Sequence, residues 1–339
     1  MVAHLPWQTE QWRRLTSALA AGQLGHANLF SGRAGAGHEE FAQAFAKFLL
    51  CEQSNEPQLG ASTEPCNECR GCLLSEAGNH PDLLLVTPEE EGKIIGVDQI
   101  RALSSFYSLK SHYGGNKLAI IMPADAMNRA ASNAILKTLE EPPNQASLIL
   151  VTDRFDAMSM TVRSRCQRTA FEHIDQNAAL EWLTQHVPDR NEAVRLLDAA
   201  LGAPLKALEL RDSDEASVHQ ELLGAWSKVA AGVINPLKAS KMCTAFPIKA
   251  VIEELLRLNY LLILAKYDLS GAFSRQEEKA HLNLQAPLDG LDLRDLYAIL
   301  DVILEGKKLI LSRANVRESD LLDSLWIALD GTYRKSNGA

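Results

Sequence analysis

Short apolar runs and helical stripes alternate along the first half of the chain. Apolar runs occupy 27–30, 83–86, 117–122 and 147–151, and a further strand is expected at 167–171. Short runs that are apolar at every position are typical of strands buried on both faces of a sheet. Stripes with apolar residues every three or four positions separate most of them, at 9–23, 41–49, 97–107 and 128–141. Strands separated by helices predict a parallel sheet covered on both faces.

The pattern changes near residue 175, after which only helical spacing remains. A small helical unit is expected from stripes at 176–186, 192–201 and 204–210, and about five amphipathic helices from the stripes within 218–333. The acidic stretch 211–215 between them indicates a linker. The predicted fold class is therefore α/β followed by all-α.

Composition narrows the class of protein. The chain has 339 residues, too many for one ordinary domain, with 46% hydrophobic and 23% charged residues, which fits a soluble globular protein. A net charge of −9 argues against a generally basic nucleic-acid binder. The amino terminus is polar and no apolar run could span a bilayer, so we expect a cytoplasmic protein with no membrane partner. Its six cysteines are then expected to be reduced thiols or metal ligands.

A glycine-rich loop follows the first predicted strand. A strand, a glycine loop and a helix in this order form the context of the phosphate-binding motif G-x-x-x-x-G-K-[ST]. Gly32 and Gly37 occupy the two glycine positions, and Gly35 lies between them. His38 replaces the lysine that neutralises the phosphates, and Glu39 replaces the hydroxyl that holds Mg²⁺. The loop is therefore interpreted as keeping its geometry without its chemistry, and an ordinary glycine turn is the alternative.

The strand at 117–122 lacks the second half of an ATP site. In P-loop ATPases such a strand ends in acidic residues that support Mg²⁺ and orient the attacking water. Here Met122 and Pro123 follow the apolar run, and neither can bind a cation. We interpret the later Asp125 as the N-cap of the next helix. Two independent losses make ATP hydrolysis by this chain improbable.

Four cysteines form the candidate metal site. Cys66, Cys69 and Cys72 have the spacing C-x₂-C-x₂-C, and a polar insert long enough to fold back separates them from Cys51. Four thiolates can close a tetrahedral zinc site with no open position, so the Zn²⁺ would be structural. The alternative is three loop cysteines and one core cysteine. A redox role is less favoured because no partner chemistry is apparent.

Two further motifs carry a resemblance to a known family. The sequence Leu-Lys-Thr-Leu-Glu-Glu-Pro-Pro at 136–143, followed by Ser164, Arg165 and Cys166, resembles the signature of AAA+ clamp-loader subunits of bacterial DNA polymerase III. The resemblance extends in order over the whole chain, including the cysteine insert and the helical tail. The altered glycine loop is more similar to a non-hydrolysing member than to the motor subunit.

The resemblance implies three domains and a place in a ring. They are a RecA-like AAA+ domain at 1–172 with a zinc-binding insert at 51–72, a helical lid at 173–210, a linker at 211–217 and a helical oligomerisation collar at 218–339. Such subunits assemble into a heteromeric ring with ATPase motor subunits, which bind the ATP, whereas binding here is weak or absent. The ring acts on a sliding clamp and primer-template DNA.

The resemblance also assigns a role to Arg165. It implies that Arg165 is an arginine finger, which reaches the ATP site of the neighbouring subunit and stabilises charge on the γ-phosphoryl group. A surface arginine in a salt bridge is the alternative. Active family members carry a lid arginine at the position of Leu205, with Lys206 one place away. This is a third departure from an active site.

Three functions remain open at this stage. The favoured one is a non-hydrolysing ring subunit without ATPase activity of its own, within a DNA polymerase holoenzyme. The second is an active AAA+ motor with an unusual ATP site. The third is a zinc-dependent nucleic-acid-binding protein unrelated to a ring. Lys137 is a candidate DNA contact, although an exposed lysine without such a role is the commoner case.

Overall fold

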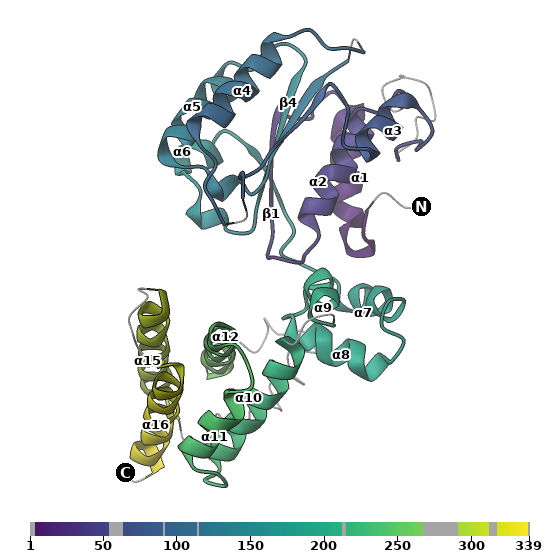
Figure 1. Ribbon diagram of the computed structural model, residues 1–339. Helices are drawn as coiled ribbons and strands as arrows, with labels where there is room; N and C mark the ends of the chain where they lie inside the picture. The colour runs from purple at the N-terminus through teal and green to yellow at the C-terminus, as the bar shows by residue number, and fades with distance from the viewer. Residues whose placement is uncertain are drawn as a thin grey trace. The chain divides into compact units, whose positions relative to one another are not determined.

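The computed structural model describes residues 4–53, 64–90, 92–113, 115–211, 215–266, 291–311 and 317–337. Contacts divide the chain into two compact units, Met1–Gln185 with Ala203–Lys206, and His186–Gly202 with Ala207–Ala339 (Figure 1). The division into three domains stays a prediction. Part of the expected insert, at 54–63, and part of the expected linker, at 212–214, lie outside the described residues.

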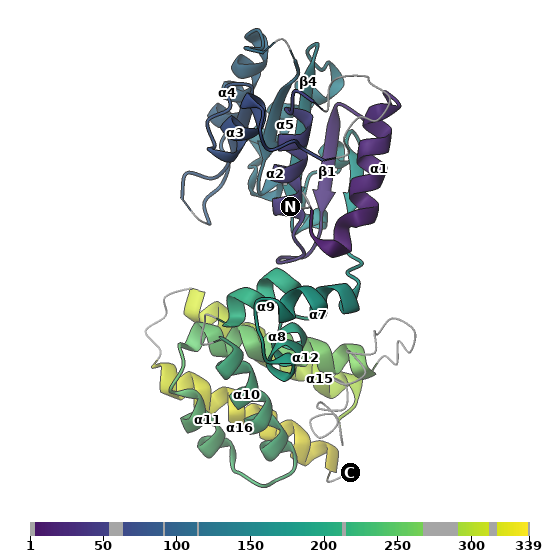
Figure 2. The ribbon, with the colours of Figure 1, turned by 90° about the vertical axis from the view of Figure 1, so that its right-hand side faces the viewer.

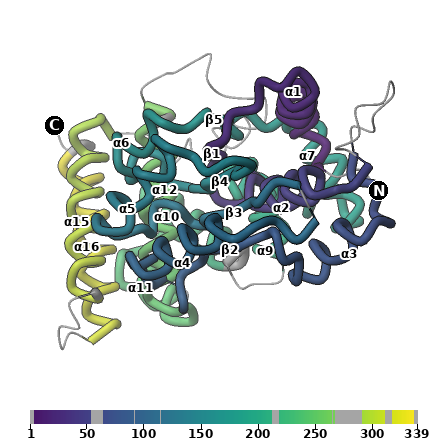
Figure 3. The backbone as a smooth tube through the Cα atoms, turned by 90° about the horizontal axis from the view of Figure 1, so that it is seen from above, coloured from purple at the N-terminus to yellow at the C-terminus, as the bar shows by residue number. Residues whose placement is uncertain are grey.

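A five-stranded parallel sheet forms the centre of the first unit. Its order is β2-β3-β4-β1-β5, with β4 in the centre between β3 and β1 (Figure 3). The predicted strands are confirmed to within two residues at each end. The α/β part of the predicted fold, with its parallel sheet, is confirmed. The strands are β1 (Ala27–Ser31), β2 (Leu83–Val86), β3 (Lys117–Ile121), β4 (Ala146–Thr152) and β5 (Gln167–Ala170).

Helices cover both faces of this sheet. Alternate residues of β4 point to opposite sides: Leu148 and Leu150 belong to the core beneath α4 and α5, and Ile149 and Val151 to the core beneath α1 and α2 (Figure 1). Burial on both faces explains why the central part of β4 is apolar on both sides. The helices of this unit are η1 (Pro6–Gln8), α1 (Thr9–Ala20), α2 (His38–Leu49), α3 (Arg70–Glu76), α4 (Val97–Ser108), η2 (Ala124–Ala126), α5 (Arg129–Glu140), η3 (Phe155–Ala157), α6 (Met160–Arg163) and α7 (Gln176–Thr184).

The predicted capping role of Asp125 is wrong. The N-cap of α5 is Asn128, whose side chain accepts a hydrogen bond from the Ala131 amide at 2.8 Å. Asp125 lies within η2, and its buried carboxylate instead accepts hydrogen bonds from Thr152 and Arg154 at the end of β4. Asp125 and Asn128 are both residue types that cap helices, so residue type alone does not show which of them is the cap. The pairing of Asp125 with Thr152 and Arg154 depends on the tertiary fold.

In the second unit, helices are the regular elements of the residues that the structure describes (Figure 2). Its core includes Trp226 of α10, whose indole donates to the Tyr333 hydroxyl of α16 at 2.9 Å, and Asn259 of α12, whose amide donates to the Leu296 carbonyl of α15 at 3.1 Å. The all-α part of the predicted fold is confirmed. Among the described ranges, none of the helices is long and apolar enough for a membrane span. The helices are α8 (Arg190–Ala199), α9 (Pro204–Arg211, shared with the first unit), α10 (Glu215–Ala230), α11 (Pro236–Cys243), α12 (Ile248–Lys266), α15 (Leu293–Leu311) and α16 (Glu318–Asn337).

Candidate nucleotide-loop and metal sites

The glycine loop joins β1 to α2, as a phosphate-binding loop does. Gly35 and Gly37 have φ values of +77° and +87°, a left-handed conformation that favours glycine. A Cβ on Gly32 would lie 2.9 Å from His38 Nδ1, so glycine leaves room for the imidazole. The loop thus keeps its sharp turns, with the His38 ring folded against its first glycine.

His38 is buried at the position of the phosphate-binding lysine. Its Nε2 lies 3.0 Å from Asp153 Oδ1, just beyond the end of β4, although the angle is not that of a hydrogen bond. The ring also packs beside Phe171, with centroids 6.1 Å apart. Glu39 follows in the first turn of α2, where its carboxylate interacts favourably with the helix dipole. Two carboxylates near the loop disfavour the approach of a triphosphate.

The loop carbonyls are bound by other parts of the same unit. The Trp7 indole donates to the Ala36 carbonyl at 2.9 Å, and the Gln8 amide donates to the Gly37 carbonyl at 2.7 Å. The Leu205 amide donates to the Gly35 carbonyl at 3.2 Å. The loop therefore connects the start of the chain to the start of α9.

Close contacts leave two of the loop glycines no space for a side chain. A Cβ on Gly35 would lie 2.6 Å from the Lys206 backbone nitrogen, and one on Gly37 would lie 2.4 Å from Leu5 Cδ1. These glycines are thus explained by protein contacts as well as by turn geometry.

The carboxyl ends of β3 and β4 hold a second pair of charges. The Asp125 carboxylate, 4% exposed, receives the Thr152 hydroxyl at 2.7 Å and two guanidinium nitrogens of Arg154 at 2.8 and 2.6 Å. A carboxylate engaged in this way is already neutralised by a cation of its own chain. It is therefore a poor ligand for Mg²⁺ without rearrangement of Arg154.

Arg165 follows α6 on the surface of the same unit. Its Nε and Nη2 lie 2.9 and 2.7 Å from Oε1 of Glu140, and its Nη1 donates to the Thr161 carbonyl at 3.1 Å. Ser164 also donates to the Thr161 carbonyl, and the neighbouring Cys166 is partly buried with a pKa raised to about 12 by burial. Arg165 thus forms the salt bridge that the alternative interpretation expects, and a role toward another subunit stays a prediction.

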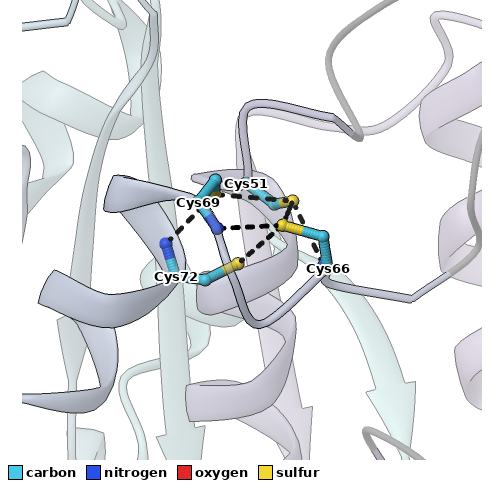
Figure 4. Close-up of side chains that lie close together, drawn as sticks. All are labelled: Cys51, Cys66, Cys69 and Cys72. Atoms are coloured by element: carbon cyan, nitrogen blue, oxygen red, sulfur yellow. Dashed lines mark hydrogen bonds between the residues drawn. The ribbon is translucent and has the colours of Figure 1, made fainter.

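The four predicted metal ligands lie together. Cys51 comes from the end of α2, Cys69 is the N-cap of α3, and Cys72 lies in its first turn (Figure 4). Sulfur–sulfur distances are 3.6 Å for Cys51–Cys66, 3.9 Å for Cys66–Cys72 and 4.0 Å for Cys51–Cys69. Zn–S bonds of ~2.3 Å at tetrahedral angles would place the sulfurs ~3.8 Å apart. The donor set therefore fits a four-coordinate zinc ion.

Backbone amides surround these sulfurs. The amides of Cys66, Cys69 and Cys72 donate to Cys51, Cys66 and Cys69 sulfurs, respectively, at 3.3 to 3.4 Å. Burial opposes ionisation of Cys66, but hydrogen bonds from the Glu68 and Cys69 amides lower its pKa to about 7. Burial raises the pKa of Cys72. Cys66 is therefore partly ionised at neutral pH. A bound metal cation would favour ionisation of the other three thiols as well.

Close packing joins the cysteine cluster to the sheet domain. A Cβ on Gly71 would lie 2.3 Å from the Leu50 carbonyl oxygen, so only glycine permits this approach of α3 to the end of α2. His80 accepts a hydrogen bond from the Asp82 amide at 3.1 Å through Nδ1 and is not among the four clustered residues.

Sequence reasoning missed the partners of the two key side chains. Asp153 beside His38, and Glu140 beside Arg165, come from distant parts of the chain and carry no motif of their own for that pairing. Glu140 did stand within the quoted Leu-Lys-Thr-Leu-Glu-Glu-Pro-Pro motif, which was the available signal. Trp7 and Gln8, which bind the loop carbonyls, carried no signal.

A parallel sheet with a glycine loop between β1 and α2 is the arrangement found in P-loop folds. A family model described as "DNA polymerase III, delta subunit" matches residues 7–175. The Pseudomonas aeruginosa protein named DNA polymerase III subunit delta' is 31% identical over 336 residues, covering 96% of this chain and 98% of the relative. The chain belongs to the family of DNA polymerase III delta' subunits.

Two further relatives show the breadth of the similarity. The Escherichia coli K12 protein named DNA polymerase III subunit delta' is 32% identical over 221 residues, covering 65% of this chain and 64% of the relative. The Bacillus subtilis protein named DNA polymerase III subunit tau is 30% identical over 256 residues, covering 74% of this chain and 44% of the relative. Similarity therefore extends to proteins named as two different subunits of DNA polymerase III.

Proposed function

We propose that this chain is a non-hydrolysing subunit of the clamp loader of DNA polymerase III. It supports the ATP-driven loading of a sliding clamp onto primed DNA by ATPase partners. Family membership supports the place in the polymerase complex. Similarity to a relative named subunit tau supports assembly with homologous subunits in a heteromeric ring. In this proposal the sheet domain at 1–172 and the lid at 173–210 hold the ring geometry, and the collar at 218–339 joins the ring.

One observation carries the non-hydrolysing assignment, which is the replacement of the phosphate-binding lysine by His38. A lysine side chain reaches the β- and γ-phosphates with a full positive charge. The His38 imidazole is instead buried against Gly32 and 3.0 Å from the Asp153 carboxylate. Met122, Pro123 and the Asp125–Arg154 pair agree with this assignment, because none of them supplies a free carboxylate for Mg²⁺. These features oppose the alternative of an active motor.

Arg165 is proposed to act in trans, in the ATP site of a neighbouring subunit. It lies on the surface, with 35% of its side chain exposed, in the Ser164–Cys166 motif that resembles the family signature. A guanidinium offers a planar set of donors that matches phosphate oxygens. In that position it would stabilise the charge of the transferring γ-phosphoryl group.

Zinc is proposed to have a structural role only. Cys51, Cys66, Cys69 and Cys72 would occupy all four positions of a tetrahedral ion, which leaves none for a substrate or water. The metal would hold α3 against the end of α2.

Co-assembly tests the proposed function. We expect the purified chain, mixed with the ATPase and remaining subunits of a DNA polymerase III clamp loader, to elute with them as one complex in size-exclusion chromatography with light scattering. Omission of this chain should abolish clamp- and primed-DNA-stimulated phosphate release. Elution of the chain alone, together with direct binding of primed DNA, would instead favour the zinc-dependent nucleic-acid-binding protein.

A further inference from the structure

The guanidinium of Arg165 is held by its own subunit at three nitrogens. Nε and Nη2 both approach Oε1 of Glu140, at 2.9 and 2.7 Å, so one carboxylate oxygen binds the side edge of the guanidinium plane. Nη1 donates to the Thr161 carbonyl at 3.1 Å, and the Ser164 hydroxyl oxygen lies 3.5 Å from the same nitrogen. Glu140 is the last residue of α5 and Thr161 lies in α6, so two helices fix the plane from two sides.

These contacts leave part of the guanidinium for another ligand. The group has five N–H donors. Glu140 accepts from Nε and pairs with Nη2, and Thr161 accepts from Nη1. One N–H remains on Nη2 and one on Nη1, the second of which has only the long contact with Ser164. More than a third of the side chain is exposed, so this end can meet an anion from outside. The arrangement fixes the orientation of the group while keeping its terminal donors available.

We propose that Glu140 is a positioning residue for Arg165, which it holds with the free end of its guanidinium directed to the phosphate of a neighbouring subunit's nucleotide. This inference rests on the proposed trans role of Arg165. Glu140 touches no nucleotide in this proposal and acts only through Arg165. The benefit is pre-organisation, because the long side chain need not be ordered when the transition state forms.

Replacement of Glu140 in the reconstituted complex tests this inference. At the one ATP site that receives Arg165, we expect Glu140→Ala to lower kcat about two- to fivefold, measured as the rate of that site's phase in single-turnover phosphate release; this is the range that exposed ion pairs of this kind supply. KM for ATP should stay within about twofold, because the lost contact acts in the transition state. Glu140→Gln keeps an acceptor oxygen but not the charge, so its kcat should lie between that of the unaltered complex and that of Glu140→Ala. Glu141→Ala is the matched control, since Glu141 is the adjacent exposed carboxylate, and the ion pair of Arg165 is with Glu140.

The possible outcomes separate the inference from the function on which it rests. The positioning role alone is overturned if Arg165→Ala lowers kcat but Glu140→Ala and Glu140→Gln have a kcat equal to or higher than that of the unaltered complex. Unchanged kcat in Arg165→Ala overturns both. The double variant Glu140→Ala/Arg165→Ala should be no slower than Arg165→Ala, and a further loss would show that Glu140 acts independently. Assembly measured by light scattering identifies any variant that fails to join the complex.

Discussion

Arg165→Ala is expected to abolish nucleotide hydrolysis at one site of the assembled clamp loader. An arginine finger accelerates phosphoryl transfer by about 10³-fold or more, so the site that receives Arg165 should become silent on the timescale of the others. The fold should persist, because Arg165 and Glu140 form an exposed ion pair that contributes at most ~1 kcal/mol. In a single-turnover time course of phosphate release, the fast phase should lose the part of its amplitude that this site contributes.

Two variants sharpen the Arg165 experiment. Arg165→Lys keeps the charge but loses the planar donor set, so it should retain only part of the fast amplitude. Arg101→Ala is the control, since Arg101 is an exposed arginine on α4 that pairs with Asp98 away from the α5–α6 junction. Full amplitude in Arg165→Ala within an intact complex would contradict the trans role.

Cys69→Ser is expected to release the zinc ion. Removal of one thiolate leaves three sulfur ligands and a hydroxyl, which is a weak zinc ligand at neutral pH. The apparent binding free energy of structural zinc in small peptides is ~10–16 kcal/mol, so the local structure should depend strongly on the metal. Zinc per chain, measured by mass spectrometry, should fall from near-stoichiometric to near zero, and proteolytic cleavage between Cys51 and Cys72 should accelerate.

Cys166→Ser provides the matched control for the metal experiment. Cys166 lies outside the four-cysteine cluster, and burial raises its pKa to about 12, so its thiol stays protonated. This variant should keep its zinc. A native chain purified without zinc, which then gains no protection from proteolysis on addition of zinc, would refute the structural metal site.

Much of the fold was predictable because it follows from local periodicity. The buried strands of a parallel sheet must be apolar on both faces, so β1, β3 and β4 are visible as continuous runs. The helices of the second unit show the 3.6-residue repeat of an apolar stripe. The strand order was not predicted, because strand pairing depends on contacts between distant segments of the chain.

The candidate sites were predictable where chemistry resides in short motifs. The C-x₂-C-x₂-C spacing identified the cysteines that the structure brings together, and the fourth, Cys51, followed from its place before the insert. The pairings of His38 with Asp153 and of Arg165 with Glu140 were not predictable, since each joins residues of ordinary type more than twenty positions apart. The capping role assigned to Asp125 failed for the same reason, because its partner Arg154 follows another strand.

The measurement that most directly tests the central claim is ATP binding and hydrolysis by the purified chain alone. Isothermal titration calorimetry with Mg²⁺–ATP, together with phosphate release, is the method, and an active ATPase subunit is the positive control. The replaced lysine and hydroxyl at His38 and Glu39 predict no saturable ATP binding at millimolar nucleotide and no turnover above buffer. Saturable binding with clear turnover would contradict the account and identify the chain as a motor subunit.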